Sequence, residues 1–148
     1  MLVLSAFAQN RLKIQDVFDK YGKQDGSVLV QLSTDILSQG SKMTFYKSLI
    51  IGEDNRKELE ILEAIKADTK DRPIISEVKK DGKIDSGTYY LMTNNHTKES
   101  EYILYKKNSK KITLVYIKGK FSPNELDMEL KKLKDLFIYV NNKRIKLQ

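Results

Sequence analysis

The sequence predicts one α+β domain, with helices packed on one face of a mostly antiparallel sheet and a late β-meander. The chain has 148 residues, of which 40% are hydrophobic, so it can bury one sizeable core. Segments with helical periodicity occur near both ends and in the middle of the chain, with short β-rich segments between them. In the second half, the β-rich segments follow one another at regular spacing with polar turns, which is typical of antiparallel strands.

The first elements alternate between helix and strand. Arg11 to Tyr21 is predicted to be a helix because its apolar residues recur on one helical face, and Gly22 is expected to end it. The apolar residues of that face are Ile14, Val17, Phe18 and Tyr21. After a turn at Asp25-Gly26, Val28 to Leu32 is a β-rich run and is predicted to be a strand.

A short helix and a second strand follow. Ser33, Thr34 and Asp35 offer capping oxygens for a helix that stops at Gly40. Thr44 to Ile51 is predicted to be the second strand because it is rich in apolar and β-branched residues.

A longer helix is predicted from Glu53 to about Lys70. Its expected apolar side consists of Leu59, Leu62 and Ile65, opposite a charged side. Pro73 is expected to close this region.

The strongest local signal is a β-hairpin. Ile74 to Lys80 is followed by Asp81-Gly82 and Lys83-Ile84, and the Asp-Gly pair favours a type I′ turn because both positions tolerate positive φ. Polar turns at Asn94-Asn95 and Asn108-Ser109 extend this hairpin into an antiparallel meander. The further strands are Tyr89 to Met92, Tyr102 to Tyr105 and Ile112 to Ile117.

The C-terminal part predicts a helix and a last hairpin. Ser122 can cap the helix, Pro123 suits its first position, and Glu125 can accept from the amide of the cap residue. Its expected buried stripe is Leu126, Leu130, Leu133 and Phe137. In Ile138 to Leu147, Asn141-Asn142 lies between apolar segments and permits a short hairpin.

The first residues resemble the end of a bacterial secretory signal. An apolar run closes on Ala6-Phe7-Ala8, a pattern of small residues that signal peptidase accommodates. This favours a signal peptide remnant at residues 1–8 and a single α+β domain at residues 9–148. The run is short and has no basic residue before Arg11, so an apolar first strand or helical turn of the folded domain remains the alternative.

The amino-acid composition limits the cellular compartments and the kinds of partner that are compatible with this chain. The chain has no cysteine, which excludes disulfides, thiolate metal sites and a lipid attached to a cysteine, and no apolar run approaches the roughly 20 residues of a membrane span. Together with the signal, this predicts a periplasmic or secreted protein.

The net charge of +7 arises from Lys98 onward, where basic residues outnumber acidic ones by 13 to 6. Such a region can attract phosphates, acidic glycans or anionic lipids, or can serve as a solvated surface.

Candidate catalytic residues are few. His96 is the only histidine and falls in a predicted loop, without a catalytic partner at a recognisable spacing. Glu99 and Glu101 would project from one face of a strand, and a pair of carboxylates can act as general acid and base. Lysines flank both residues, however, which is typical of a solvated strand edge. No glycine-rich nucleotide-binding loop occurs. We therefore expect no enzymatic activity, no cofactor and no metal site.

The late meander is predicted to carry a binding surface. Tyrosines interleaved with lysines can stack on bases or sugar rings, although tyrosines that pack in the core with their hydroxyls at its boundary would give the same pattern. The residues of this predicted binding surface are Lys106, Lys107, Lys110, Lys111, Lys118, Tyr102, Tyr105 and Tyr116.

Three segments resemble an uncharacterised family of small exported bacterial proteins, known only as a domain of unknown function. These segments are Tyr21-Gly22-Lys23 leading into Val28 to Ser33, the strand Lys47 to Ile51, and Ile112 to Lys120. The resemblance spans Ile14 to Leu133 and consists of hydrophobic patterns and a few glycines. It implies a signal peptide, alternating helices and strands, and a late meander. It also implies an exported, non-enzymatic protein, and it brings no activity with it.

Hypotheses from different functional classes follow. The favoured one is an exported binding or interaction module of the bacterial cell envelope, which contacts a protein, a glycan or an anionic surface through its sheet and the lysine-rich hairpin 106–111. The alternative is a nucleic-acid-binding protein that uses the same basic surface, which requires that residues 1–9 are not a signal. A third is an envelope hydrolase that acts through Glu99, Glu101 or His96.

Overall fold

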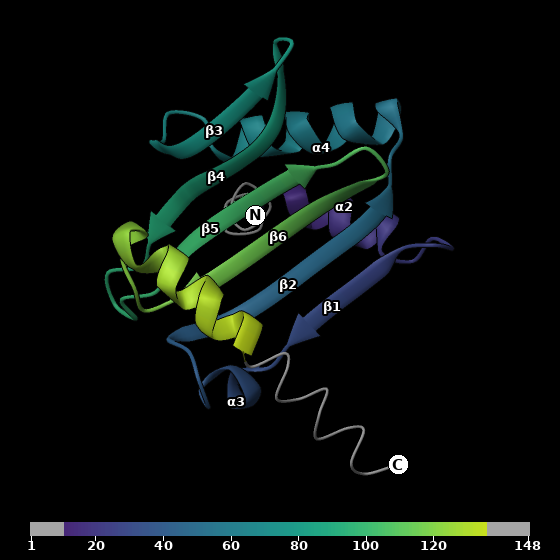
Figure 1. The fold of residues 1–148 in the computed structure, drawn as a ribbon. Helices are drawn as coiled ribbons and strands as arrows, with labels where there is room; N and C mark the ends of the chain where they lie inside the picture. The colour runs from purple at the N-terminus through teal and green to yellow at the C-terminus, as the bar shows by residue number, and fades with distance from the viewer. Residues whose placement is uncertain (1–10, 136–148) are drawn as a thin grey trace, which may run out of the picture.

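The described part of the computed structural model, residues 11–135, is built around one six-stranded antiparallel sheet (Figure 1). The strand order is β1-β2-β6-β5-β4-β3, so β1 and β3 are the edges. The strands are β1 (Val28–Leu32), β2 (Met43–Gly52), β3 (Ile74–Lys80), β4 (Lys83–Thr93), β5 (Ser100–Lys107) and β6 (Lys111–Gly119). Strands β3 to β6 form the predicted meander, and β2 pairs with β6. The predicted α+β class with an antiparallel sheet is therefore confirmed.

Two helices, α2 (Lys13–Tyr21) and α4 (Asn55–Asp68), cover one side of the sheet, which we call the α2/α4 face. The apolar stripe predicted for the first helix is buried in full and joins one core cluster with sheet residues such as Leu49 and Leu114. The carboxylate of Asp68, at the end of α4, accepts the backbone N–H groups of Lys13 and Ile14 at 2.7 and 2.9 Å. This contact satisfies free amides at the start of α2 and joins the two helices.

The buried side of α4 differs from the predicted one. Its apolar contacts with the core come from Ile61, Ala64 and Ile65, and Glu58 is buried beside them. Leu59 is 62% exposed, so its predicted place in the core is wrong. The reason is the rotation of the helix about its axis, since apolar residues lie on more than one side and only contact with the sheet selects among them.

The turns of the meander follow the predicted chemistry. Asp81 and Gly82 have φ values of 52° and 77°, as a type I′ hairpin turn requires. Asn108 accepts the backbone N–H groups of Lys110 and Lys111 with its side chain. Asn94 does the same for two amides of the β4–β5 loop. The meander turns lie where the sequence indicates. The strands do as well, except that Lys83-Ile84 and Tyr89 to Met92, predicted as separate strands, form one continuous strand, β4.

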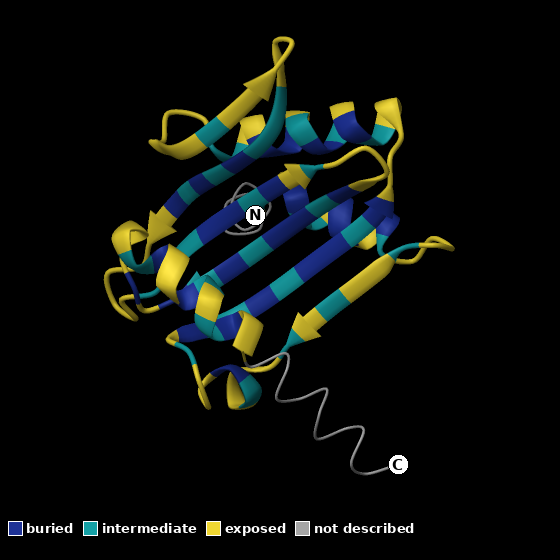
Figure 2. Ribbon diagram, in the orientation of Figure 1, coloured by how far each residue is buried: buried dark blue, intermediate teal, exposed yellow. Residues whose placement is uncertain are grey.

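The opposite face of the sheet carries α3 (Thr34–Leu37) and a helix at residues 126–135, which crosses in front of β5, β6 and β2 (Figure 1). The expectation placed all helices on one face, and the second covered face is the difference. Neighbouring residues of the central strands alternate between the two sides, so that Ile103 belongs to one core cluster and Tyr102 to the other. The central strands are consequently buried on both faces, whereas the edge strands β1 and β3 are largely exposed (Figure 2).

The last helix begins differently from the prediction. Ser122 makes no side-chain capping bond, and a 3₁₀ turn, η1 (Pro123–Glu125), precedes the α-helical part. The Glu125 carboxylate instead lies 3.2 Å from the Lys42 ammonium, so the predicted capping box is wrong. Leu126 and Leu133 are buried as expected, while Leu130 is partly buried.

Several predictions fall outside the described residues. They are the signal remnant at residues 1–8, the buried position of Phe137 and the hairpin at residues 138–147. Within the described residues, none of the helices has both the length and the apolar character needed to cross a membrane.

Candidate functional site

Four of the predicted surface lysines gather where β5 turns into β6. Lys106 and Lys107 end β5, and Lys110 and Lys111 follow the turn. The end of the β3–β4 hairpin lies next to them, and between the two turns there is a cavity of about 680 Å³, which we call the hairpin cleft. Its charged lining consists of Glu53, Glu58, Lys80, Asp81, Lys83, Asp85, Lys106 and Lys107.

Lys107 has a structural role inside the hairpin cleft. Its ammonium lies 2.9 Å from Glu58 and 3.4 Å from Glu53, and the Glu58 side chain is only 6% exposed. The hydrogen bond that Lys107 donates to Glu58 is the main cause of the raised pKa of Lys107. A buried carboxylate needs such a partner, so this lysine is occupied in holding α4 against β5.

Other lysines around the hairpin cleft are available to a partner. Lys83, Lys106, Lys110 and Lys111 are all exposed, and within the described part of the chain none of them forms an ion pair. They come from two neighbouring hairpin ends, so their charges add over one part of the surface.

Two of the predicted surface tyrosines belong to the core instead. Tyr102 and Tyr105 are 0% and 2% exposed and lie in the core clusters of opposite faces. Their predicted place on a shared binding surface is therefore wrong, because residues three apart on a strand point to opposite sides and both sides of β5 are covered. Tyr116 is partly buried on the α2/α4 face, and its hydroxyl donates to Glu101.

Lys118 lies at the other end of β6, beside a second cavity of about 510 Å³. This cavity, which we call the His96 cleft, is lined by Thr34, Thr44, Phe45, His96, Thr97, Glu99, Lys118 and Lys120. The cleft brings together α3, the start of β2, the β4–β5 loop and the end of β6. Three of these residues, His96, Glu99 and Lys118, had been singled out from the sequence for unrelated reasons. No feature of the sequence pointed to Thr34, Phe45 or Lys120 as site residues.

The polar groups of the His96 cleft stabilise the charged form of one carboxylate, that of Glu99. The Thr44 hydroxyl donates to the Glu99 carboxylate, which is the main reason that the pKa of Glu99 is lowered, and the nearby Lys118 and Lys120 add to it. His96 donates its backbone N–H to Asn94, and no described residue makes a hydrogen bond or an ion pair with its imidazole. Glu99 and Glu101 each accept from a hydroxyl, so the described residues provide an ionised acceptor but no imidazole–carboxylate pair.

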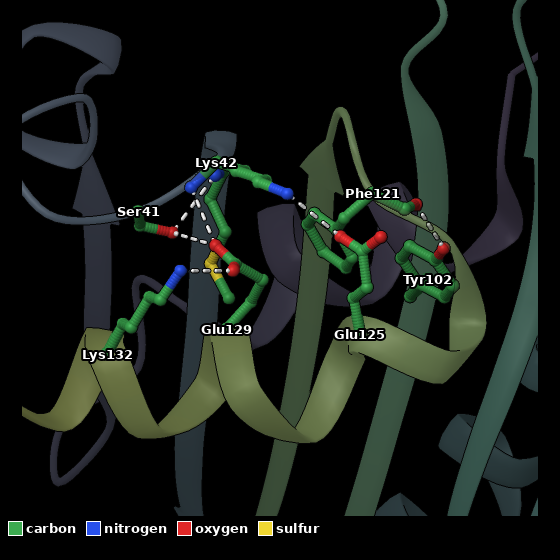
Figure 3. A network of polar contacts seen from close by, with 8 residues as sticks. Ser41, Lys42, Tyr102, Phe121, Glu125, Glu129 and Lys132 are labelled. Carbon is green, nitrogen blue, oxygen red and sulfur yellow. Dashed lines mark hydrogen bonds and ion pairs between the residues drawn. The ribbon is translucent and has the colours of Figure 1, made fainter.

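A third polar cluster holds the last helix to the sheet (Figure 3). Glu129 is 1% exposed, and its carboxylate accepts from the Lys42 backbone N–H at 2.6 Å and the Ser41 hydroxyl at 3.2 Å. The Lys132 ammonium lies 3.0 Å from its second oxygen. Burial acts to raise the pKa of Glu129, but the Lys42 amide, Lys132 and Ser41 outweigh it and lower the pKa. The sequence did not point to Glu129, because a single Glu in an amphipathic helix is usually exposed.

The acidic groups of the described residues do not form a metal centre. No set of three or more histidine, cysteine, aspartate or glutamate side chains in residues 11–135 is placed to hold a metal ion. The two clefts therefore offer ammonium, hydroxyl and carboxylate groups as their binding chemistry.

Comparison with known proteins assigns the chain to a family. A family of unknown function, DUF6108, matches residues 1–130. The chain belongs to this family. The expected membership of a family of unknown function is thus confirmed, while the match carries no activity with it. No curated protein and no solved structure shows a significant match to the chain.

Proposed function

We propose that this protein is an exported, non-enzymatic binding module of the bacterial cell envelope, and that it binds an anionic partner through the exposed lysines around the hairpin cleft. The observation that carries the proposal is the group Lys83, Lys106, Lys110 and Lys111, which belongs to two adjacent hairpin ends. None of these lysines is neutralised by a described carboxylate. Free ammonium groups held close together on a rigid sheet attract an extended polyanion.

The composition of the hairpin cleft favours a polyanion over a small neutral ligand. Charged side chains of both signs line it. Of its acidic groups, Glu53 and Glu58 are paired with Lys107, Asp85 lies 3.9 Å from the Lys80 ammonium, and Asp81 is exposed in the turn. The remaining positive charge lies at the rim, where a long acidic glycan or an acidic protein segment can reach it. Export is supported by the Ala6-Phe7-Ala8 pattern at the start of the chain.

The proposal is tested by binding to immobilised polygalacturonate, a linear acidic glycan, at low and at physiological salt. A variant with Lys83, Lys106, Lys110 and Lys111 all changed to Gln is expected to bind about tenfold more weakly at low salt. The matched control removes four exposed lysines elsewhere, Lys23, Lys66, Lys70 and Lys131, and is expected to change the affinity by less than about twofold. Equal losses in the two variants would show that only net charge matters and would contradict the proposal.

The nucleic-acid alternative is separated by the same assay and by localisation. A 20-base-pair DNA duplex replaces the glycan, and the logarithm of the affinity is followed against the logarithm of the salt concentration. DNA as the true partner requires a steep slope, close to the number of phosphates contacted, together with an intact N-terminus in the cytosol. We instead expect the mature chain to begin at Gln9 in the exported fraction, as read by N-terminal sequencing.

A further inference from the structure

The His96 cleft holds two ammonium groups that lie close enough to Glu99 to lower its pKa but form no ion pair with it. Lys118 and Lys120 both line the cleft, and no carboxylate of the described residues forms an ion pair with either of them. Lys118 is partly buried at the end of β6, so its position is set by the sheet. Two such donors at one end of a cavity are suited to a carboxylate or another small anionic group.

The same cleft holds an acceptor that stays ionised. The Glu99 carboxylate accepts from the Thr44 hydroxyl, which holds its pKa below the ordinary range, and the Glu99 backbone N–H is bound by the Thr97 hydroxyl. An ionised carboxylate only accepts hydrogen bonds, and its remaining lone pairs can take donors from a ligand. A ligand that uses the whole cleft therefore needs hydrogen-bond donors as well as an anionic group.

An aromatic side chain completes the cleft. Phe45 is partly exposed and faces Lys118 across the β2–β6 pair. Its ring packs edge-on against Tyr116, with 5.7 Å between centroids and 61° between planes, which fixes its orientation. An apolar ring next to ammonium and carboxylate groups offers a surface for the C–H groups of a sugar ring.

We propose that the His96 cleft binds an acidic sugar of the hexuronate class. The sugar carboxylate pairs with Lys118 and Lys120, its hydroxyls donate to Glu99, and the apolar side of its ring packs on Phe45. The cavity of about 510 Å³ is of ordinary size for a small-ligand site. A simple anion would use the lysines but not Phe45 or Glu99, whereas a sugar acid uses all four of these side chains. The site lies at the opposite end of β6 from the hairpin cleft and does not depend on the function proposed there.

The test is a titration of the ¹⁵N-labelled full chain with D-glucuronate, followed by amide chemical shifts and calorimetry. Glucose, inorganic phosphate and AMP serve as comparators. Glucuronate is expected to shift the amides of His96, Thr97, Lys118 and Lys120, and to bind about tenfold more tightly than each comparator. Preferential binding of phosphate or AMP, or no shift at these amides, would overturn the proposal.

Two variants separate the sugar site from a general anion site. The double variant Lys118→Gln, Lys120→Gln is expected to lose about tenfold in glucuronate affinity, while the matched double variant Lys66→Gln, Lys70→Gln, which removes two exposed lysines that line neither cleft, keeps it. Phe45→Leu is expected to lower glucuronate binding about threefold and to leave weak phosphate binding unchanged. An equal loss for both ligands in Phe45→Leu would point to a general change in the cleft and would contradict the sugar contact. An equal loss of binding in the Lys66, Lys70 control would show that only net charge matters and would overturn the proposal.

Discussion

The two covered faces of the sheet hold their helices by different interactions. On the α2/α4 face, the helices contact the sheet mainly through apolar stripes, with one buried ion pair, Glu58 to Lys107, between α4 and β5. The carboxylate of Asp68 joins the two helices to each other. On the opposite face, the helix 126–135 has a smaller apolar stripe that contains Leu126 and Leu133, and Glu129 lies fully buried near its centre. Glu129 binds the Ser41–Lys42 segment, which leads directly into β2 (Figure 3).

This difference bears on how each helix is positioned. Burial of apolar surface is favourable in many orientations, because it depends on area and not on direction. Hydrogen bonds to a buried carboxylate need a particular geometry, so Glu129 fixes the position of its helix along β2 more narrowly than leucine contacts alone. The cost of this arrangement is that loss of the carboxylate leaves buried donors without acceptors.

The largest expected effect comes from Glu129→Ala. The substitution removes the acceptor of the Lys42 N–H and the Ser41 hydroxyl and leaves a cavity where a side chain that is 1% exposed had been. We expect the free energy of unfolding to fall by about 2–4 kcal/mol, since two partly buried donors lose their partner and packing is lost as well. Urea unfolding followed by circular dichroism measures this change.

Two further variants control for the loss of charge and of shape. Glu63→Ala removes an exposed glutamate of α4 that makes no ion pair with a described residue, and we expect a change within about 0.5 kcal/mol. Glu129→Gln keeps an oxygen acceptor for the Lys42 amide and should lose less stability than Glu129→Ala. If Glu129→Ala were as mild as Glu63→Ala, the helix would be held by its leucines alone, and the two faces would not differ.

The fold was predictable from the sequence where local chemistry decides it. Asp81-Gly82 indicates its turn because few residue pairs tolerate two positive φ values, and the first helix shows a single apolar stripe. The rotation of α4 was not predictable, since Leu59 and Ile61 are equally apolar and only contact with the sheet separates them. The covered second face was missed because an apolar stripe shows that a helix packs on the sheet but not on which side.

The candidate sites depend still more on long-range pairing. The hairpin lysines could be placed together because they are close in sequence. The His96 cleft could not, since Phe45 meets Lys118 only through the register of β2 on β6, and Thr34 arrives from α3. The tyrosines were misplaced for a simpler reason. The strand period of two puts Tyr102 and Tyr105 on opposite faces, and a central strand has both faces buried.

Tyr102→Phe gives the next largest effect and probes the face that Glu129 organises. The Tyr102 hydroxyl donates to the Phe121 carbonyl at 2.8 Å, and its ring stacks on the Phe121 ring at 5.2 Å. Removal of the hydroxyl keeps the stacking but leaves a buried carbonyl without this donor. We expect a loss of about 1 kcal/mol in the free energy of unfolding, measured by urea unfolding. An unchanged midpoint would mean that another donor replaces the hydroxyl.

Tyr105→Phe is the matched change on the α2/α4 face, and we expect the smallest effect there. The Tyr105 side chain is 2% exposed, and its hydroxyl has no hydrogen-bond partner among the described residues. Burial, with a smaller contribution from nearby Glu58, raises the pKa of this hydroxyl, so it stays protonated and uncharged at physiological pH. Its removal breaks no described bond and relieves the cost of a buried, unpaired polar group, which is about 1–3 kcal/mol before the small cavity is counted. Stability should therefore stay the same or rise, in contrast to Tyr102→Phe three residues earlier on the same strand. A loss as large as that of Tyr102→Phe would show that the Tyr105 hydroxyl has a partner after all, and that polar contacts position both faces alike.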